Sequence, residues 1–153
     1  IFDNIGTNDV IAGAVEVLVG VDTTTQEDAT TTTATGINDP TPDPPSITTV
    51  TANAWVIAIG SSTEADIPTA PTNYINLIED QSTGTNIMMA TREIASPGAE
   101  NPGTFGGIVG DASDSWCAAT VAVRPAANGG PAALAGHGLL LSHRRNRLVQ
   151  LAA

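Results

Sequence analysis

Side chains able to do nucleophilic or acid–base chemistry are few in this chain of 153 residues, and they lie far apart. The single cysteine is Cys117, and the two histidines, His137 and His143, lie near the C-terminus. A nucleophile needs a base held beside it, and both histidines fall outside the part of the chain with strand-like sequence. The Gly-x-Ser-x-Gly and Walker patterns are absent. The sequence therefore predicts a protein that is not an enzyme, with no catalytic residue and no cofactor.

Closely spaced acidic residues are the remaining candidates for chemistry. Asp111 and Asp114 share one turn, and because acidic turns can gather oxygen ligands around calcium, these two are the calcium candidates. The favoured alternative is that they are solvated turn acids. Hydrolysis of a sugar by paired carboxylates needs a cleft with aromatic platforms, and aromatic residues make up only 3% of the chain. Trp55 and Trp116 lie inside apolar runs and are predicted as core anchors. A small hydrolase using Asp111 or Asp114 is therefore the least favoured interpretation.

Charge is distributed unevenly along the chain, which carries a net charge of −11. All 16 acidic residues lie between Asp3 and Asp114. Because an acidic body repels phosphate backbones, residues 1–125 are not expected to bind nucleic acid. No apolar run reaches the roughly 18 residues of a membrane span. Cys117 has apolar neighbours and is predicted to be a small buried residue, and a single cysteine excludes an internal disulfide.

The secondary-structure elements that carry these residues are predicted to be β-strands. Thr, Gly and Pro stand where Glu, Lys and Leu would build helices, and short β-branched runs alternate with turn signals. The Thr-rich stretch 23–35 is predicted to be an edge strand or an extended surface loop. The pattern indicates an all-β chain: an antiparallel, jelly-roll-like β-sandwich over residues 1–125. Its predicted strands cover residues 14–21, 47–51, 54–60, 74–80, 86–94, 105–109 and 116–123.

The tail, residues 126–153, differs in composition from the rest of the chain. A hinge at Asn128–Pro131 precedes an Ala- and Leu-rich stretch that is predicted to form one short amphipathic helix. Leucines recur there every seven residues, and the arginines lie where cations complement the helix dipole. We expect this helix to dock against a neighbouring subunit through Leu134, Leu141, Arg144, Arg145, Arg147 and Leu148.

Two stretches resemble a known class of module. Ala54-Trp-Val-Ile-Ala-Ile-Gly60, followed by a Pro-rich loop and Tyr74, is similar to the middle of a β-sandwich module of tailed-phage and prophage structural proteins. The run from Ala90 to Phe105, with Ser113-Asp-Ser-Trp-Cys-Ala-Ala-Thr-Val-Ala-Val-Arg-Pro125, is similar to its carboxyl end. Members usually begin with further strands around a Gly-Asp-Leu-Leu-Leu type segment. The resemblance implies that the sandwich of residues 1–125 lacks those N-terminal strands.

What the resemblance implies is a virion structural protein: a capsid decoration, fibre or tail-associated module that assembles with copies of itself and with other virion proteins. The alternative is a secreted carbohydrate-binding module of a bacterial surface protein, extracellular rather than part of a virion, with a host-surface glycan as ligand. Assembly into an array of fixed stoichiometry favours the first interpretation. An exposed aromatic platform or bound calcium favours the second.

Overall fold

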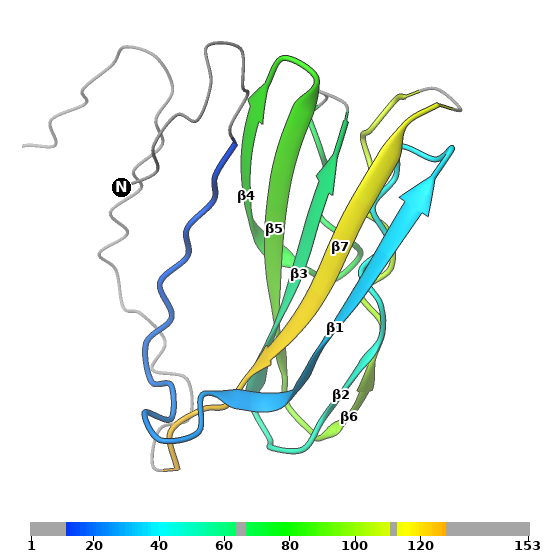
Figure 1. Ribbon diagram of the computed structural model, residues 1–153. Coiled ribbons are helices and arrows are strands. Elements are labelled where there is room, and N and C mark those ends of the chain that lie inside the picture. Colours follow the sequence, from blue (N-terminus) through cyan, green and yellow to red (C-terminus); the bar gives the residue numbers. More distant parts are fainter. Residues whose placement is uncertain (1–11, 64–66, 111–112, 128–153) are drawn as a thin grey trace, which may run out of the picture.

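The computed structural model describes residues 12–63, 67–110 and 113–127, which form seven strands and contain no helix (Figure 1). All strand pairs are antiparallel, so the predicted all-β, antiparallel class is confirmed. No helix in this part of the chain is long and apolar enough to cross a membrane. The strands are β1 Glu27–Ile37, β2 Ile47–Thr49, β3 Ala54–Ser62, β4 Ile75–Ser82, β5 Thr85–Ile94, β6 Gly98–Glu100 and β7 Ser115–Val123.

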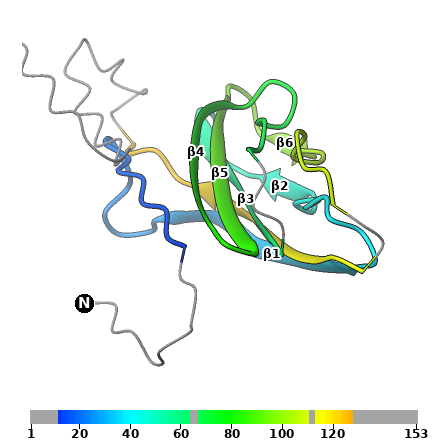
Figure 2. The same ribbon diagram turned by 90° about the horizontal axis from the view of Figure 1, so that it is seen from above.

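Five strands form the main sheet in the order β1-β7-β3-β5-β4, and β2 pairs with β6 in a second, small sheet. Figure 2 shows β2 and β6 on one side of the main sheet, which we call its core face; the opposite side is the outer face. Strand β3 is central, whereas β1 and β4 are the edges. Side chains of β3 alternate between buried and partly buried along its whole length, as expected of a strand with a packed layer on one side only.

The core face is built from small residues and is filled from the loops. Its buried positions include Ala58, Ala90 and Ala122, which leave room above the sheet. Phe105 occupies that room and is fully buried, and its backbone N–H donates to the carbonyl of Pro42 at 3.0 Å. The remaining members of the core cluster that come from outside the main sheet are Ile47 and Tyr74.

Gly60 marks the closest approach between these loops and the main sheet. A Cβ built on Gly60 would stand 2.8 Å from the Cβ of Pro42 and 3.1 Å from the ring of Phe105. Neither distance leaves room for a side chain, so the loops rest directly on the backbone of β3. The loops that flank β2 and β6 therefore help to cover the core face of the main sheet.

Most predicted strands are present. The segments predicted at 47–51, 54–60, 74–80, 86–94 and 116–123 correspond to β2, β3, β4, β5 and β7. Residues 27–35 of the Thr-rich stretch belong to β1, so of the two predicted alternatives, an edge strand or an extended surface loop, this part is an edge strand. Threonine suits such a position, since β-branched residues favour the extended backbone and the hydroxyl tolerates solvent.

Two predicted strands are wrong and one strand was missed. Residues 14–21 are extended, but the only bridge in that segment pairs Val21 with Pro125. The alternation of apolar and polar residues there predicted a strand, although no described strand pairs with the segment. Residues 105–109 form a loop with an isolated bridge from Gly106 to Thr69, because Phe105 turns into the core. The short β6 lies where Pro and Gly indicated only turns. The predicted tail helix lies outside the described residues.

Candidate interaction surface

Strand β1 presents an open sheet edge. Its ladder with β7 is regular from Thr32, opposite Thr120, to Ile37, opposite Ser115, and the irregularities are confined to residues 27–32. Within the described residues no strand pairs with its other side. The stretch Ala29–Ile37 contains no charged residue and no proline. Proteins usually block such an edge with charge, proline, a bulge or a covering segment, so this uncharged edge is able to accept another strand.

The opposite edge, β4, is protected by several of those devices. It carries Glu79 and Asp80, and its pairing with β5 is irregular between Ile75 and Ile78. The segment that begins at residue 12 approaches β4 at its start and then diverges from it (Figure 1), and the backbone N–H of Gly13 donates to the Asp80 carboxylate at 3.1 Å. Charge, irregular pairing and a flanking segment therefore oppose strand addition at β4.

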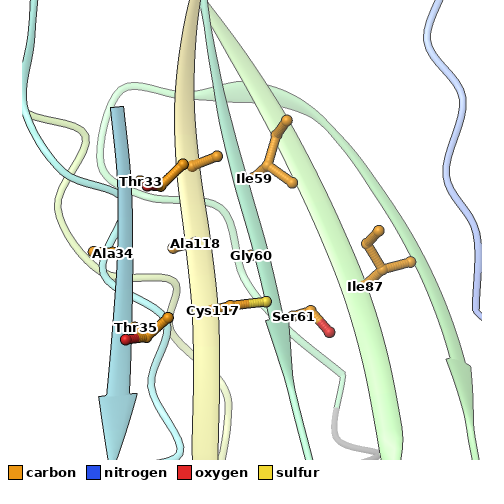
Figure 3. Close-up of a pocket in the computed structure, with 10 residues that line it drawn as sticks. Thr33, Ala34, Thr35, Ile59, Gly60, Ser61, Ile87, Cys117 and Ala118 are labelled. Carbon is orange, nitrogen blue, oxygen red and sulfur yellow. The ribbon is translucent and has the colours of Figure 1, made fainter. Parts of the chain in front are cut away.

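A shallow, open depression lies on the outer face beside β1 (Figure 3). It has a volume of about 310 Å³ and follows two rows of the sheet. In one row Thr35, Cys117, Ser61 and Ile87 lie opposite one another on β1, β7, β3 and β5. The row beside it contains Thr33, Ala119, Ile59 and Met89. Small residues on β7, flanked by threonines on one side and isoleucines on the other, create the depression, and its surface is almost entirely apolar.

Two predictions about side-chain burial are wrong, because both side chains lie on the outer face. Cys117 is exposed, because it alternates with the buried Ala118 and so points away from the core. Trp55 is only partly buried and is not part of the core cluster, since it follows the buried Ala54 on β3. Sequence neighbours suggested burial at both sites, but strand parity decides which face each side chain meets.

A polar row closes the core at the end of β3. Asn86, Ser62 and Trp116 lie opposite one another on β5, β3 and β7. The amide oxygen of Asn86 accepts hydrogen bonds from the backbone N–H and the hydroxyl of Ser62, at 3.0 and 3.1 Å. Asn86 Nδ2 and Trp116 Nε1 are buried donors with no hydrogen-bond partner among the described residues. A second depression at this end, lined mostly by serine and threonine residues, includes Trp116 but not Asn86.

A buried carboxylate fixes the start of β1. Asp28 Oδ2 accepts hydrogen bonds from the backbone N–H groups of Val50 and Thr51, at 2.7 and 3.2 Å, and Oδ1 lies 3.4 Å from Arg124 Nε. Burial acts to raise the pKa of Asp28, but the hydrogen bonds from Thr51 and Val50, together with the charge of Arg124, lower that pKa below its ordinary value. Asp28 thus ties β1 to the turn after β2 and to the end of β7.

A second buried group joins the small sheet to the main one. Glu100 Oε1, on β6, accepts from Arg92 Nη1 at 2.8 Å and from the Tyr74 hydroxyl at 3.2 Å. Burial, followed by the nearby Glu100 carboxylate, raises the pKa of Tyr74 well above its ordinary range. The three side chains satisfy one another at the boundary between the layers, which is the geometry of a structural cross-link rather than of a substrate site.

The residues singled out in the sequence are not brought together. Asp114 is nearly buried, with Oδ1 accepting from the Thr63 hydroxyl at 3.3 Å, whereas Asp111 lies outside the described residues, so the calcium pair stays a prediction. Both histidines and all the predicted assembly residues of the tail also lie outside them. Among the residues that the structure describes, no group of three or more His, Cys, Asp or Glu side chains is placed to hold a metal ion.

The described residues thus define a class: an all-β fold of two antiparallel sheets, with one protected edge, one open edge and a partly exposed apolar outer face. Comparison with protein-family models, with curated proteins and with solved structures finds no match to this chain.

Proposed function

We propose that this chain is a non-enzymatic structural module that works by assembling with other protein subunits. The observation that carries the proposal is the contrast between its two sheet edges, because one edge has several of the common protections against pairing and the other has an uncharged stretch of nine residues. A protein that must stay monomeric protects both edges. The apolar outer face beside β1 supports the same proposal, since apolar patches often mark contacts between proteins.

The finer form of the proposal is a virion structural protein: a capsid decoration, fibre or tail-associated module that forms homo-oligomers and docks on other virion proteins. It rests on the resemblance of residues 54–60, 90–105 and 113–125 to phage structural modules. The tail leucines and arginines would then anchor residues 1–125 to a neighbouring subunit, with the Thr- and Pro-rich loops left facing outward.

Native mass tests this proposal directly. Particles that contain the chain should be imaged by electron microscopy, and their mass should be measured by light scattering on the same sample. A symmetric array with fixed stoichiometry is the expected result. A chain that stays monomeric in every fraction, with no bound partner protein, would contradict an assembly role.

The second candidate is a carbohydrate-binding module, and Trp55 is the observation that favours it. Its indole is partly exposed on the outer face, on the same side of the sheet as the depression, and flat sheet faces with an aromatic ring can stack on sugar rings. A glycan array would show binding that is lost in Trp55→Ala and kept in Ile37→Ala. No binding to any glycan would remove this candidate.

A further inference from the structure

We propose that two copies of this chain pair through β1, antiparallel and about a two-fold axis, so that their main sheets join into one continuous sheet. This inference rests on the proposed assembly function and names its partner, a second copy, and its contact, the open edge. The result is an isologous interface, in which the same strand serves both subunits.

The first step is that β1 has the capacity to accept a strand. In an antiparallel ladder, alternate residues direct their backbone N–H and C=O groups away from the existing partner. No backbone hydrogen bond from Thr30–Ile37 to any described segment other than β7 is present. Thr33, Thr35 and Ile37 are exposed, so nothing in the described part of the chain shields this edge from an incoming strand. Strand addition satisfies such backbone groups and extends the sheet.

The second step is that the charge pattern of β1 favours pairing with itself. Its only charged residues, Glu27 and Asp28, lie at its first two positions, and Asp28 is buried against Arg124. An antiparallel partner centred on the uncharged stretch leaves both acids beyond the paired region. A parallel partner would align the acids of the two chains, and like charges opposite one another are destabilising. The pattern thus selects one orientation.

The third step is the match between side chains. Threonine occupies five of the nine positions from Ala29 to Ile37, so antiparallel self-pairing sets threonine mainly against threonine or alanine. Cross-strand pairs of β-branched residues and of hydroxyl groups stabilise sheets. A two-fold axis between antiparallel edge strands stands perpendicular to the sheet. Both outer faces therefore lie on the same side, and the depression of Figure 3 occurs once on either side of the central ribbon.

Charge substitutions on β1 test the pairing in the full chain. Thr33→Lys with Thr35→Lys places positive charges on both sides of the axis, and Thr33→Glu with Thr35→Glu places negative charges there. Sedimentation velocity across a range of concentrations should show a dimer for the unmodified chain. Each charged variant should dissociate at least about ten-fold more readily, and an equimolar mixture of the two should recover the dimer. The matched control is Gln81→Lys with Ser82→Lys, at exposed positions of the protected edge, which should leave the dimer unchanged.

Hydrogen exchange supplies a second readout that does not depend on the variants. Amide protection within residues 29–37 should rise with chain concentration, whereas protection within residues 75–82 should not. Far-UV circular dichroism should show that every variant keeps the sandwich, so that lost pairing is not confused with unfolding.

The outcomes separate this inference from the proposed function. A dimer that forms equally well in both charged variants overturns pairing through β1 but leaves an assembly role intact through another surface. A chain that stays monomeric at high concentration overturns the self-pairing, and protection of residues 29–37 in that monomer would identify another segment of the chain as the occupant. The native-particle mass then decides the assembly role independently.

Discussion

Trp116 and Gly36 lie directly opposite each other in the ladder between β7 and β1, and the indole occupies the space that a side chain at position 36 would need. Gly36 is not in a left-handed conformation. Glycine is therefore required at position 36 because the indole of Trp116 lies so close, and not because of the backbone conformation.

Gly36→Ala should lower the free energy of unfolding by about 1–3 kcal/mol, because the indole must move to admit a methyl group. Urea titration followed by tryptophan fluorescence measures the effect. Gly98→Ala is the matched control, since a Cβ at that position meets nothing within 4 Å. Equal unfolding midpoints for the two variants would contradict the packing of Trp116 on Gly36.

Asp28→Asn should cost about 1.5–3 kcal/mol at neutral pH, as expected for hydrogen bonds to a charged group. The folded-state pKa of Asp28 is lowered, so its contribution is fully present above the ordinary pKa of about 4 and is lost as the pH falls through the lower folded value. The difference between the two chains should therefore shrink in acid. Urea unfolding from pH 2 to pH 7 checks this, with the exposed Asp43→Asn as control. A difference that does not depend on pH would refute the role assigned to the carboxylate.

Tyr74 is the only tyrosine in the chain, so absorbance at 295 nm reports its ionisation alone. Because its folded-state pKa is raised, no tyrosinate should form in the folded protein near pH 10, where the chain in urea titrates normally. The stabilising effect of the neutral phenol is fully present below pH 10 and is lost as the pH rises further. Ionisation near pH 10 without unfolding would show that the phenol is not held beside Glu100.

Cys117 should react with a thiol reagent in the folded protein at about the rate seen in the unfolded chain, because its side chain lies on the outer face. The matched comparison is Cys117→Ser combined with Ala118→Cys, which moves the thiol by one residue to the buried face. That thiol should react at least about 100-fold more slowly, since it becomes accessible only when the fold opens. Similar rates for the two positions would contradict the assigned strand parity.

Strands with strong β-branched character were predictable from sequence, and so was the extended backbone of the Thr-rich stretch. The failures share one physical cause: a strand needs a partner, and its local sequence does not show whether one is present. Residues 14–21 alternate well but pair with no strand of the part of the chain that the structure describes, apart from one isolated bridge at Val21. Gly98–Glu100 is a poor strand sequence, yet it pairs with β2. Cys117 and Trp55 were misassigned because their apolar neighbours said nothing about parity.

The open edge was also beyond local sequence reasoning. The Thr-rich stretch could be recognised as extended, but the contrast with β4 depends on strand order, which nothing in the local pattern fixes. The segment that flanks β4 comes from residues far away in the chain, joined through Gly13 and Asp80. Once the order of the strands is known, β4 and β1 are recognised as the two edges. The charges of β4 then oppose strand addition, and the uncharged stretch Ala29–Ile37 permits it.

Because the core depends on loop residues, several loops of this protein are unsuitable for inserting a peptide. Surface loops are the ordinary places to insert a peptide, yet the segments around Pro42 and Phe105 rest on the backbone of Gly60 and cannot be lengthened without opening the core. The tight turn between β4 and β5 is exposed, and Gly84 there has open space around it. A foreign epitope displayed at that turn should leave the scaffold folded, while the same insertion beside Pro42 should abolish soluble expression.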